Sequence, residues 1–206
     1  MKKILSIALA LLLIFTLVAC NSAPKEWSRG KVVDNVYTSE FAGIKLTPPD
    51  SNWIYYSDEQ IAQLMNLTTQ MDIFSDEQKA QMELAKQQTI YDAVLANSTS
   101  GSNINVVYEN LEQNPVAKDL DAKGYADLLI SQIKQMQGTN IGEKFEKTVA
   151  GQKYVCIEGS ISSYGMTMNQ RYLLRKIGNY ILAITITQGP QSTDSLDSLE
   201  TIITKK

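Results

Sequence analysis

The fold is decided near the C-terminal end of the chain by three neighbouring runs, KYVCIEGSIS (153–162), MTMNQRYLLRK (166–176) and YILAITITQ (180–188). Each run is rich in the β-branched and aromatic residues that favour strands. Three residues separate each run from the next, and Gly165 and Gly178 lie in these gaps. Connections this short join antiparallel strands. We therefore predict an antiparallel meander, with residues 145–149 as a further strand before it.

Strand signals also open the globular part of the chain. Residues 32–47 carry apolar side chains on both sides of a turn at 39–40 or 42–43. This pattern predicts two short strands that form a hairpin. Pro48 and Pro49 end the second strand, because proline has no N–H to donate to a ladder.

The tetrapeptide Ser-Asp-Glu-Gln occurs twice, at 57–60 and at 75–78. In each copy the serine is a favourable N-cap, and the glutamine three residues later completes the pattern of a capping box. We predict one helix after Ser57 and a second that runs from Ser75 to about Ala96. The recurrence is either an internal repeat or the same capping solution used twice.

The remaining segments complete an alternation of strands and helices. Residues 104–111 are predicted to form a strand. Residues 121–136 are predicted to form a helix, because the apolar residues of that segment recur at helical spacing. A last helix is predicted from about Thr193. We expect an α+β fold with a central antiparallel sheet of about six strands and helices on both faces, an α/β/α sandwich. Residues 31–206 are long enough to form one such domain.

The N-terminus has the architecture of a secretory signal. Lys2 and Lys3 precede an apolar run over residues 4–18, and the run ends in Leu17-Val18-Ala19-Cys20. The last four residues resemble a bacterial lipobox, which predicts cleavage before Cys20 and attachment of a diacylglycerol to its thiol. The alternatives are a plain signal peptide, which rarely places cysteine at this point, or an uncleaved anchor, which needs about 20 apolar residues. We expect residues 1–19 to be a lipoprotein signal peptide, residues 20–30 a lipidated tether, and the protein to be extracytoplasmic and anchored to the bacterial cell membrane.

The amino-acid composition excludes several kinds of catalytic and metal site and argues against some classes of partner. The chain contains no histidine, so Ser-His-Asp catalysis, Cys-His catalysis and histidine-ligated zinc are excluded. Loss of residues 1–19 would leave 17 basic and 22 acidic residues and a net charge of −5. This acidity argues against nucleic acid or anionic lipid as the main partner. No motif indicates a metal or a cofactor, so we expect neither.

One longer motif points to a known family. Tyr37-x-x-x-Phe41-x-Gly43-Ile44-x-Leu46-x-x-Pro49-x-x-x-Trp53 resembles the opening of PsbP-like domains, a fold shared with Mog-type Ran-binding proteins and bacterial DcrB-type lipoproteins. The order of elements is similar from about residue 33 to 203. The resemblance implies a PsbP-like sandwich and a non-enzymatic partner or accessory protein. It supplies no catalytic residue.

Several side chains are candidates for contact with a partner or for reactivity. Tyr55 and Tyr56 belong to the densest aromatic stretch, and Tyr164 and Met166 lie at the tip of a predicted hairpin. Aromatic residues are enriched at binding hot spots, although they also fill cores. Cys156 is either a nucleophile or a packing thiol, and its position inside a predicted apolar strand favours packing.

These observations lead to three hypotheses for function. The first is a membrane-tethered, non-catalytic module that binds another protein or serves as an accessory to it. The alternative is a receptor lipoprotein for a small ligand, which a closed pocket lined by tyrosine and methionine would favour. The third is an enzyme that works without histidine, for which no catalytic constellation is visible.

Overall fold

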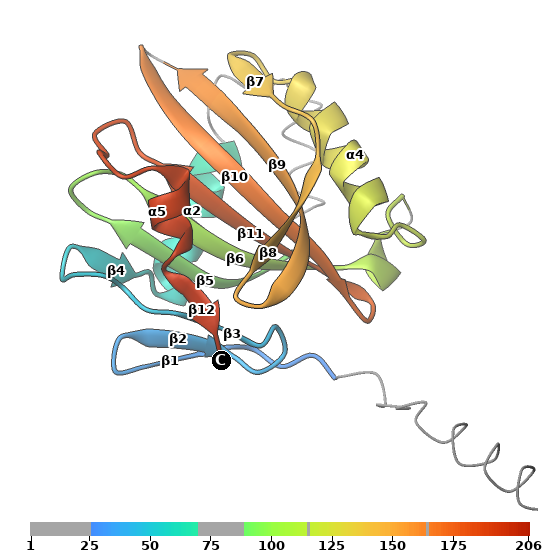
Figure 1. Ribbon diagram of the computed structural model, residues 1–206, viewed down its shortest axis with the longest axis horizontal. Coiled ribbons are helices and arrows are strands. Elements are labelled where there is room, and N and C mark those ends of the chain that lie inside the picture. The colour runs from blue at the N-terminus through green and yellow to red at the C-terminus, as the bar shows by residue number, and fades with distance from the viewer. Residues whose placement is uncertain (1–25, 70–88, 115, 164) are drawn as a thin grey trace, which may run out of the picture.

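The computed structural model describes residues 26–69, 89–114, 116–163 and 165–206. In this part of the chain the strands form two antiparallel sheets, one of eight strands and one of four. Figure 1 shows the large sheet with the small sheet packed at one end of it.

The eight-stranded sheet has the strand order β4-β5-β6-β11-β10-β9-β7, and β8 pairs with the same edge of β9 as β7 does. Its centre is the predicted meander, in which β9 pairs with β10 and β10 with β11. The strands are β4 (Trp53–Tyr55), β5 (Thr89–Asn97), β6 (Asn103–Asn110), β7 (Thr139–Ile141), β8 (Phe145–Val149), β9 (Gln152–Ser163), β10 (Met166–Ile177) and β11 (Tyr180–Gln188).

The four-stranded sheet joins the two ends of the described chain. Its order is β1 (Lys31–Val33), β2 (Val36–Ser39), β3 (Ile44–Leu46) and β12 (Ile203–Lys205). Asp34 and Asn35 connect β1 to β2 with positive φ angles of 50° and 58°. Two left-handed residues in a two-residue connection are typical of a type I′ hairpin turn.

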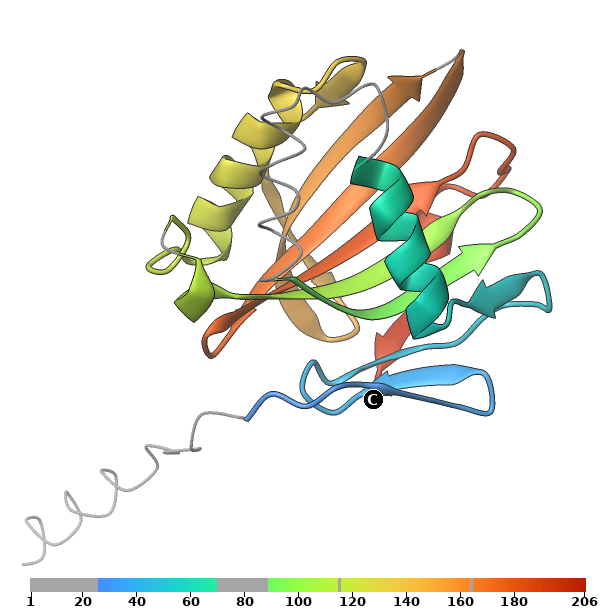
Figure 2. The same cartoon turned by 180° about the vertical axis from the view of Figure 1, so that it is seen from behind.

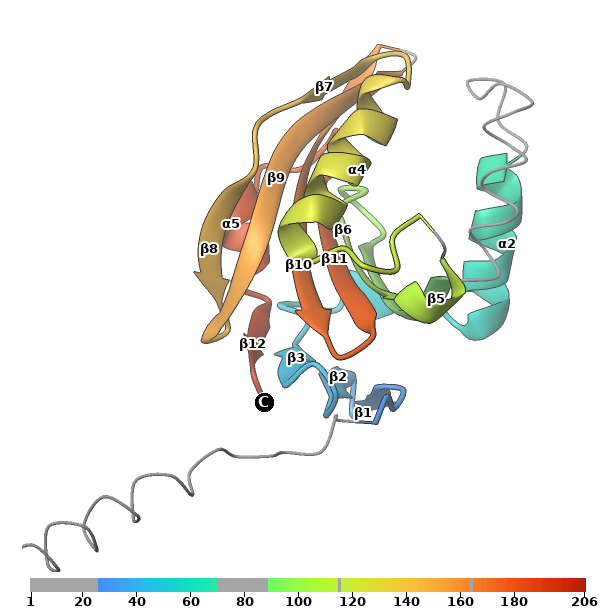
Figure 3. The same ribbon diagram turned by 90° about the vertical axis from the view of Figure 1, so that its right-hand side faces the viewer.

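Helices cover only part of the sheets. The helical segments are α2 (Asp58–Thr69), the short 3-10 helix η1 (Leu111–Gln113), α4 (Ala122–Lys134) and α5 (Leu196–Glu200). The capping box predicted at Ser57 is confirmed, because the Ser57 N–H donates to Gln60 Oε1 at 2.8 Å and the Gln60 N–H to Ser57 Oγ at 3.3 Å. Figures 2 and 3 show α2 and α4 on the same side of the large sheet.

The two faces of the large sheet bury separate apolar clusters. One cluster lies under α4 and includes Val155, Ile157 and Ala126. The other lies between the large sheet, the small sheet and α5, and includes Tyr154 and Cys156. The alternation along β9 therefore places Cys156 and Val155 on opposite faces, as period-two strand geometry requires.

The predicted α/β/α sandwich with a sheet of about six strands is wrong. One face of the large sheet is covered by α4, but the other is covered mainly by a second sheet, with α5 contributing one short turn of helix. The hairpin predicted over 32–47 is in fact three strands, β1, β2 and β3, with two turns. Short strands far apart in the chain close this second sheet, and local periodicity does not reveal such pairing.

Two other predicted helices differ from the structure. Of the helix predicted from Ser75 to about Ala96, residues 75–88 lie outside the described residues. Residues 89–96, expected to end a helix, belong to β5, where four consecutive residues from Asp92 to Leu95 are buried. An apolar run buried on both faces shows no alternation, so strand and helix cannot be separated by period alone. The helix expected from Thr193 has five residues in α5, and β12 follows it.

The segment before β1 contacts the domain. Trp27 stacks on Tyr180 with ring centroids 6.1 Å apart and meets Tyr108 edge-on at 6.2 Å. Arg29 donates to the Asp58 carboxylate at 3.1 Å, and the Gly30 N–H donates to both carboxylate oxygens of Asp92 at 3.0 Å. Within the described residues, the domain therefore begins at Trp27.

Candidate binding groove

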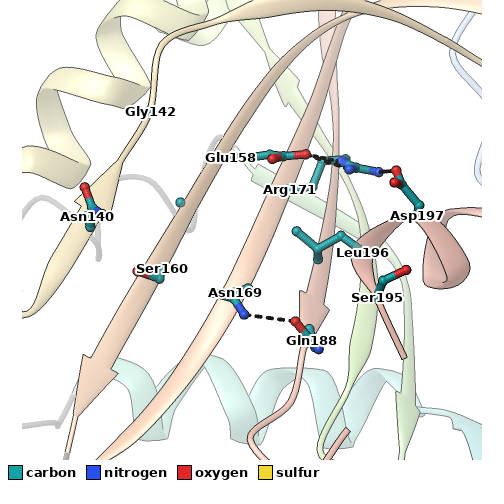
Figure 4. Close-up of a pocket in the computed structure, with 11 residues that line it drawn as sticks. Asn140, Gly142, Glu158, Ser160, Asn169, Arg171, Gln188, Ser195, Leu196 and Asp197 are labelled. Carbon is teal, nitrogen blue, oxygen red and sulfur yellow. Dashed lines mark hydrogen bonds and ion pairs between the residues drawn. The ribbon is translucent and has the colours of Figure 1, made fainter. Parts of the chain in front are cut away.

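An open groove of about 560 Å³ crosses one face of the large sheet beside α5. Figure 4 shows side chains from β7, β9, β10, β11 and α5 around it. Five of the eleven lining residues are uncharged and polar and three are charged, and the lining contains neither tyrosine nor methionine. The lining residues are Asn140, Gly142, Glu158, Gly159, Ser160, Asn169, Arg171, Gln188, Ser195, Leu196 and Asp197.

Gly159 allows the floor of the groove to form. It pairs with Ile141 of β7 and Gln170 of β10, so backbone approaches it from both sides. A Cβ atom at this position would lie 2.6 Å from the Asn140 carbonyl oxygen and 2.7 Å from the Ile141 Cδ1 atom. Real Cβ atoms do not come this close to backbone oxygens, so glycine is required for β7 to lie against β9.

Arg171 is the centre of an ion cluster at one end of the groove. The residue is 5% exposed, and its guanidinium donates to Glu158 at 2.6 and 2.8 Å and to Glu200 at 2.6 Å. Its Nη1 atom also lies 2.9 Å from the Asp197 carboxylate. Lys147 adds a second cation, 2.9 Å from both Asp197 and Glu200. The cluster joins β8, β9 and β10 to α5 and holds the short helix over the sheet. Figure 4 shows Arg171 between Glu158 and Asp197.

Arg171 and Asp197 of this cluster stay charged at neutral pH. Burial opposes the charge of Arg171, but hydrogen bonds with Glu158, Glu200 and Asp197 outweigh it and raise the pKa of the guanidinium. Hydrogen bonds from Lys147 and Arg171 lower the pKa of Asp197. Neither group is therefore suited to exchange a proton near pH 7.

Amide side chains and a helix start complete the groove. Asn169 donates to the Gln188 side-chain oxygen at 2.9 Å, and Gln188 donates in turn to the Asp194 carbonyl at 2.7 Å. Ser195 caps α5 by accepting the Ser198 N–H at 3.1 Å. These bonds fix the loop between β11 and α5 as one wall of the groove.

The contact residues predicted from sequence do not form one surface. Cys20 and Tyr164 lie outside the described residues. Tyr55 is half-buried, donates to the Leu46 carbonyl at 2.9 Å and accepts the Tyr37 N–H at 3.2 Å, so its hydroxyl bridges the two sheets. Burial raises the pKa of Tyr55 to about 12.

Tyr56 and Met166 belong to parts of the large sheet that are far apart. Tyr56 is half-buried, directly after the edge strand β4, and its N–H donates to the Val94 carbonyl at 2.9 Å. Met166 begins β10, next to the hairpin between β9 and β10, and is 54% exposed. Three strands, β5, β6 and β11, separate β4 from β10. Of the described candidates, Met166 is the one that presents a large exposed side chain.

Cys156 is a packing residue, as its strand position predicted. Its side chain is fully buried in the cluster between the sheets. Burial, with the nearby Glu200 carboxylate, raises the pKa of the thiol to about 11. A nucleophilic cysteine needs a lowered pKa and access to solvent, and Cys156 has neither.

Sequence reasoning missed the Arg171 cluster. Its members come from four elements, so no single segment of the sequence contains them. A weak signal was present, since Glu158 and Arg171 are charged residues inside apolar strands and face each other across β9 and β10. In the described part of the chain, no group of three or more potential ligands could hold a metal ion.

Comparisons with known proteins find only distant similarity. No family model matches the chain, and no curated protein matches it. A structure of LpqN, involved in cell envelope biogenesis of Mycobacterium tuberculosis, is similar over 78% of this chain and 82% of that one, with 12% identity and a TM-score of 0.44. A Bacteroides thetaiotaomicron structure covers 88% of this chain and 49% of its own, with 9% identity and a TM-score of 0.39.

A protein of unknown function from Pseudomonas aeruginosa, PA94, is 18% identical over 46% of this chain and 64% of its own, with a TM-score of 0.32. Similarity at this level assigns no function to the chain. The comparisons do not confirm the resemblance to PsbP-like domains.

Proposed function

We propose that this protein is a lipid-anchored extracytoplasmic lipoprotein that serves as a non-catalytic binding or accessory module, with the polar groove as its binding surface. The observation that carries the anchor is the sequence Leu17-Val18-Ala19-Cys20 behind Lys2, Lys3 and an apolar run. A diacylglycerol on Cys20 supplies two acyl chains, which suffices for stable attachment. None of the described helices is long and apolar enough to cross a membrane.

The groove supports a binding role better than a catalytic one. Arg171 is held charged by Glu158, Glu200 and Asp197, and Asp197 is held charged by Lys147 and Arg171, so neither is poised to transfer a proton. The remaining lining is dominated by amides and hydroxyls, which recognise polar groups through hydrogen bonds. Carboxamides such as Asn140 and Asn169 suit the backbone of an extended peptide or a segment of a folded protein.

A receptor for a small ligand is the second candidate, and the volume of the groove favours it. About 560 Å³ falls within the range of known ligand sites. However, such sites are usually enclosed and lined by apolar side chains, whereas this groove is open and polar. A partner that covers the groove from outside fits this geometry better than a ligand enclosed by it.

The anchor is tested by replacing each cysteine in turn. The full chain, produced in a bacterial host, should partition into the detergent phase, and mass spectrometry should find a diacylglycerol on Cys20. Cys20→Ala should abolish both properties, whereas the matched variant Cys156→Ala should retain them. Recovery of Cys20→Ala as normally acylated protein would refute the anchor.

The binding role is tested by photo-crosslinking in intact cells. A photoreactive side chain at Asn169 or Ser160, inside the groove, should give a discrete adduct that is reproducible between preparations. The control position is Lys134, which is exposed at the end of α4. Adducts of equal yield at Lys134, or none at either groove position, would contradict the groove as the binding surface.

A further inference from the structure

The outer face of the four-stranded sheet carries lysine and no carboxylate along its central row. In the register of the sheet, Lys31 pairs with Thr38, Thr38 with Lys45, and Lys45 with Thr204. The neighbouring positions Tyr37, Ile44 and Leu46 are fully buried, so strand alternation turns the row outward. We call this surface the lysine face, formed by Lys31, Val33, Thr38, Lys45 and Thr204.

Both lysines of the lysine face are available to bind an external anion. Lys31 and Lys45 are in no ion pair with any residue in the described ranges. The acidic residues near the lysine face lie at its margins: Asp34 is in the β1–β2 turn, and Glu40 pairs with Lys206. This face therefore differs in charge from the chain as a whole, which without residues 1–19 has a net charge of −5.

The chain enters the domain next to this face. Trp27 packs on Tyr180 and Tyr108, and Gly30 is bonded to Asp92 immediately before β1 begins at Lys31. Seven residue steps separate Cys20 from Trp27 in the sequence. Even a fully extended segment of that length spans at most about 25 Å. An acyl group on Cys20 would hold Trp27, which packs against the domain four residues before β1, within this distance of the bilayer.

We propose that the lysine face lies against the anionic lipid headgroups of the membrane in which Cys20 is anchored, and that the groove is presented away from it. The inference rests on the proposed lipid anchor. Figures 1 and 3 show the small sheet and the start of β1 at one end of the molecule, and the β9–β10 hairpin and β7 at the other. Val33, which is 63% exposed, adds an apolar side chain to the membrane side.

Two lysines are enough to orient the domain, because the lipid anchor already holds the domain at the membrane surface. Each lysine near an anionic leaflet contributes about a fivefold preference. The tether removes the translational cost of binding, so this preference acts on orientation alone. Twelve residues of β10 lie between the far hairpin and the β10–β11 turn beside Trp27. At about 3.3 Å per residue, the hairpin tip would stand roughly 36 Å beyond that turn.

The test compares two fluorescent probes on the full lipidated chain. One probe is attached at Thr204→Cys, on the lysine face, and the other at Met166→Cys, on the far hairpin. Cys156 is buried and acylated Cys20 has no thiol, so labelling is selective. The proteins are reconstituted in phosphatidylcholine vesicles with and without phosphatidylglycerol, and a spin-labelled headgroup serves as the quencher. We expect at least fivefold stronger quenching at Thr204 than at Met166 when phosphatidylglycerol is present.

Charge reversal identifies the residues responsible. Lys31→Glu with Lys45→Glu should reduce the difference between the probes to the level seen in phosphatidylcholine alone. The matched control is Lys118→Glu with Lys134→Glu, which changes the net charge equally at exposed sites outside the lysine face and should leave quenching unchanged. Equal quenching of the two probes, or an equal effect of both double variants, would overturn the proposal.

The failure of this inference is distinguishable from failure of the proposed function. Mass spectrometry of the reconstituted protein establishes whether Cys20 is acylated before any quenching is measured. Absence of the lipid contradicts the proposed function. An acylated protein that shows no preferred orientation contradicts only the role of the lysine face. Circular dichroism of each double variant verifies that the fold is retained.

Discussion

The hydroxyl of Tyr37, on β2, donates a hydrogen bond to the carboxylate of Asp92, on β5, and this contact joins the two sheets inside the core. Both residues are buried, Tyr37 completely and Asp92 to within 7%. Asp92 lies where the β5–β6 register shifts between Tyr91 and Ala93. Because of this irregularity, the Asp92 carboxylate points toward the interface between the two sheets. Bulges often redirect a side chain in this way.

The carboxylate of Asp92 is satisfied by three partners. Besides Tyr37, it accepts the Gly30 N–H at 3.0 Å and lies 3.6 Å from the Arg29 Nε atom. A buried charge is costly unless hydrogen bonds compensate it. Asp92 thereby links the segment before β1, the small sheet and the large sheet through one side chain.

Replacing Asp92 tests this link. Asp92→Ala leaves the Tyr37 hydroxyl and the Gly30 N–H without an acceptor, so the free energy of unfolding should fall by about 3 kcal/mol. Asp92→Asn keeps one acceptor oxygen and should cost about 1 kcal/mol. Urea denaturation measures both values.

The control is a double-mutant cycle with Tyr37→Phe. If the two side chains interact directly, Tyr37→Phe should cost much less in the Asp92→Ala background than in the wild type. Additive effects of the two substitutions would show that the contact contributes nothing to stability.

The same carboxylate gives a pH dependence of known sign. Burial raises the pKa of Asp92, and the bonds from Tyr37, Gly30 and Arg29 only partly offset it. As pH rises, the unfolded chain therefore loses this proton before the folded one does. Between the ordinary aspartate pKa and the raised one, the stability of the wild type relative to Asp92→Asn should fall as pH increases.

Asp197 provides the opposite case for comparison. Its pKa is lowered by Lys147 and Arg171, so the stability of the wild type relative to Asp197→Asn should rise with pH over the acidic range. Urea denaturation of the three proteins from about pH 3 to pH 7 checks both signs. Parallel curves for the two variants would contradict the electrostatic assignment.

The elements that sequence analysis predicted correctly are those with strong local signals. The meander β9–β11 has long strands and short glycine turns, and α4 has helical spacing after the N-cap Asp121. β5 was missed because four consecutive buried residues erase the alternation that identifies a strand. β12 was missed because three residues acquire their structure only by pairing with β3, about 160 positions earlier.

The candidate groove could not be predicted from the sequence for a similar reason. Asn140, Asn169 and Gln188 are ordinary polar residues until β7, β10 and β11 bring them to one face. The burial of Arg171 depends on α5 lying over the sheet, and α5 is held there by Arg171 itself. Such mutual dependence leaves no periodic pattern in the chain.

Cys156 should behave as a structural thiol. With its pKa raised to about 11, two units above the ordinary value of 9.0, the thiolate fraction is reduced about 100-fold before burial is considered. The native protein should therefore react with a thiol reagent at least that much more slowly than the urea-unfolded chain. Cys156→Ala should cost roughly 1 kcal/mol. If the native protein reacted as fast as the urea-unfolded chain, Cys156 would be a reactive cysteine and not a structural one.

Arg171→Ala tests whether the ion cluster holds α5. Removing one partner of a fully buried pair costs about 3–5 kcal/mol. Because Asp197 and Glu158 are substantially exposed, we expect a smaller loss of about 2 kcal/mol, with faster hydrogen exchange in α5. Lys123→Ala, which breaks the exposed pair with Glu146, should leave stability nearly unchanged, because water and salt screen exposed ion pairs. Equal effects of the two substitutions would contradict a central role for Arg171.

Gly159→Ala tests whether close approach of β7 forms the floor of the groove. The added methyl would lie 2.6 Å from the Asn140 carbonyl oxygen, so β7 must move away from β9 or the sheet must distort. Overpacking of this kind costs about 1–3 kcal/mol. Hydrogen exchange should accelerate at the Gly142 amide, which donates to the Glu158 carbonyl at 2.8 Å across this junction. Ser160→Ala changes the next residue without adding bulk and should leave both exchange and stability nearly unchanged. If Gly159→Ala behaves like Ser160→Ala, then β7 tolerates the methyl group, and the groove does not depend on glycine at this position.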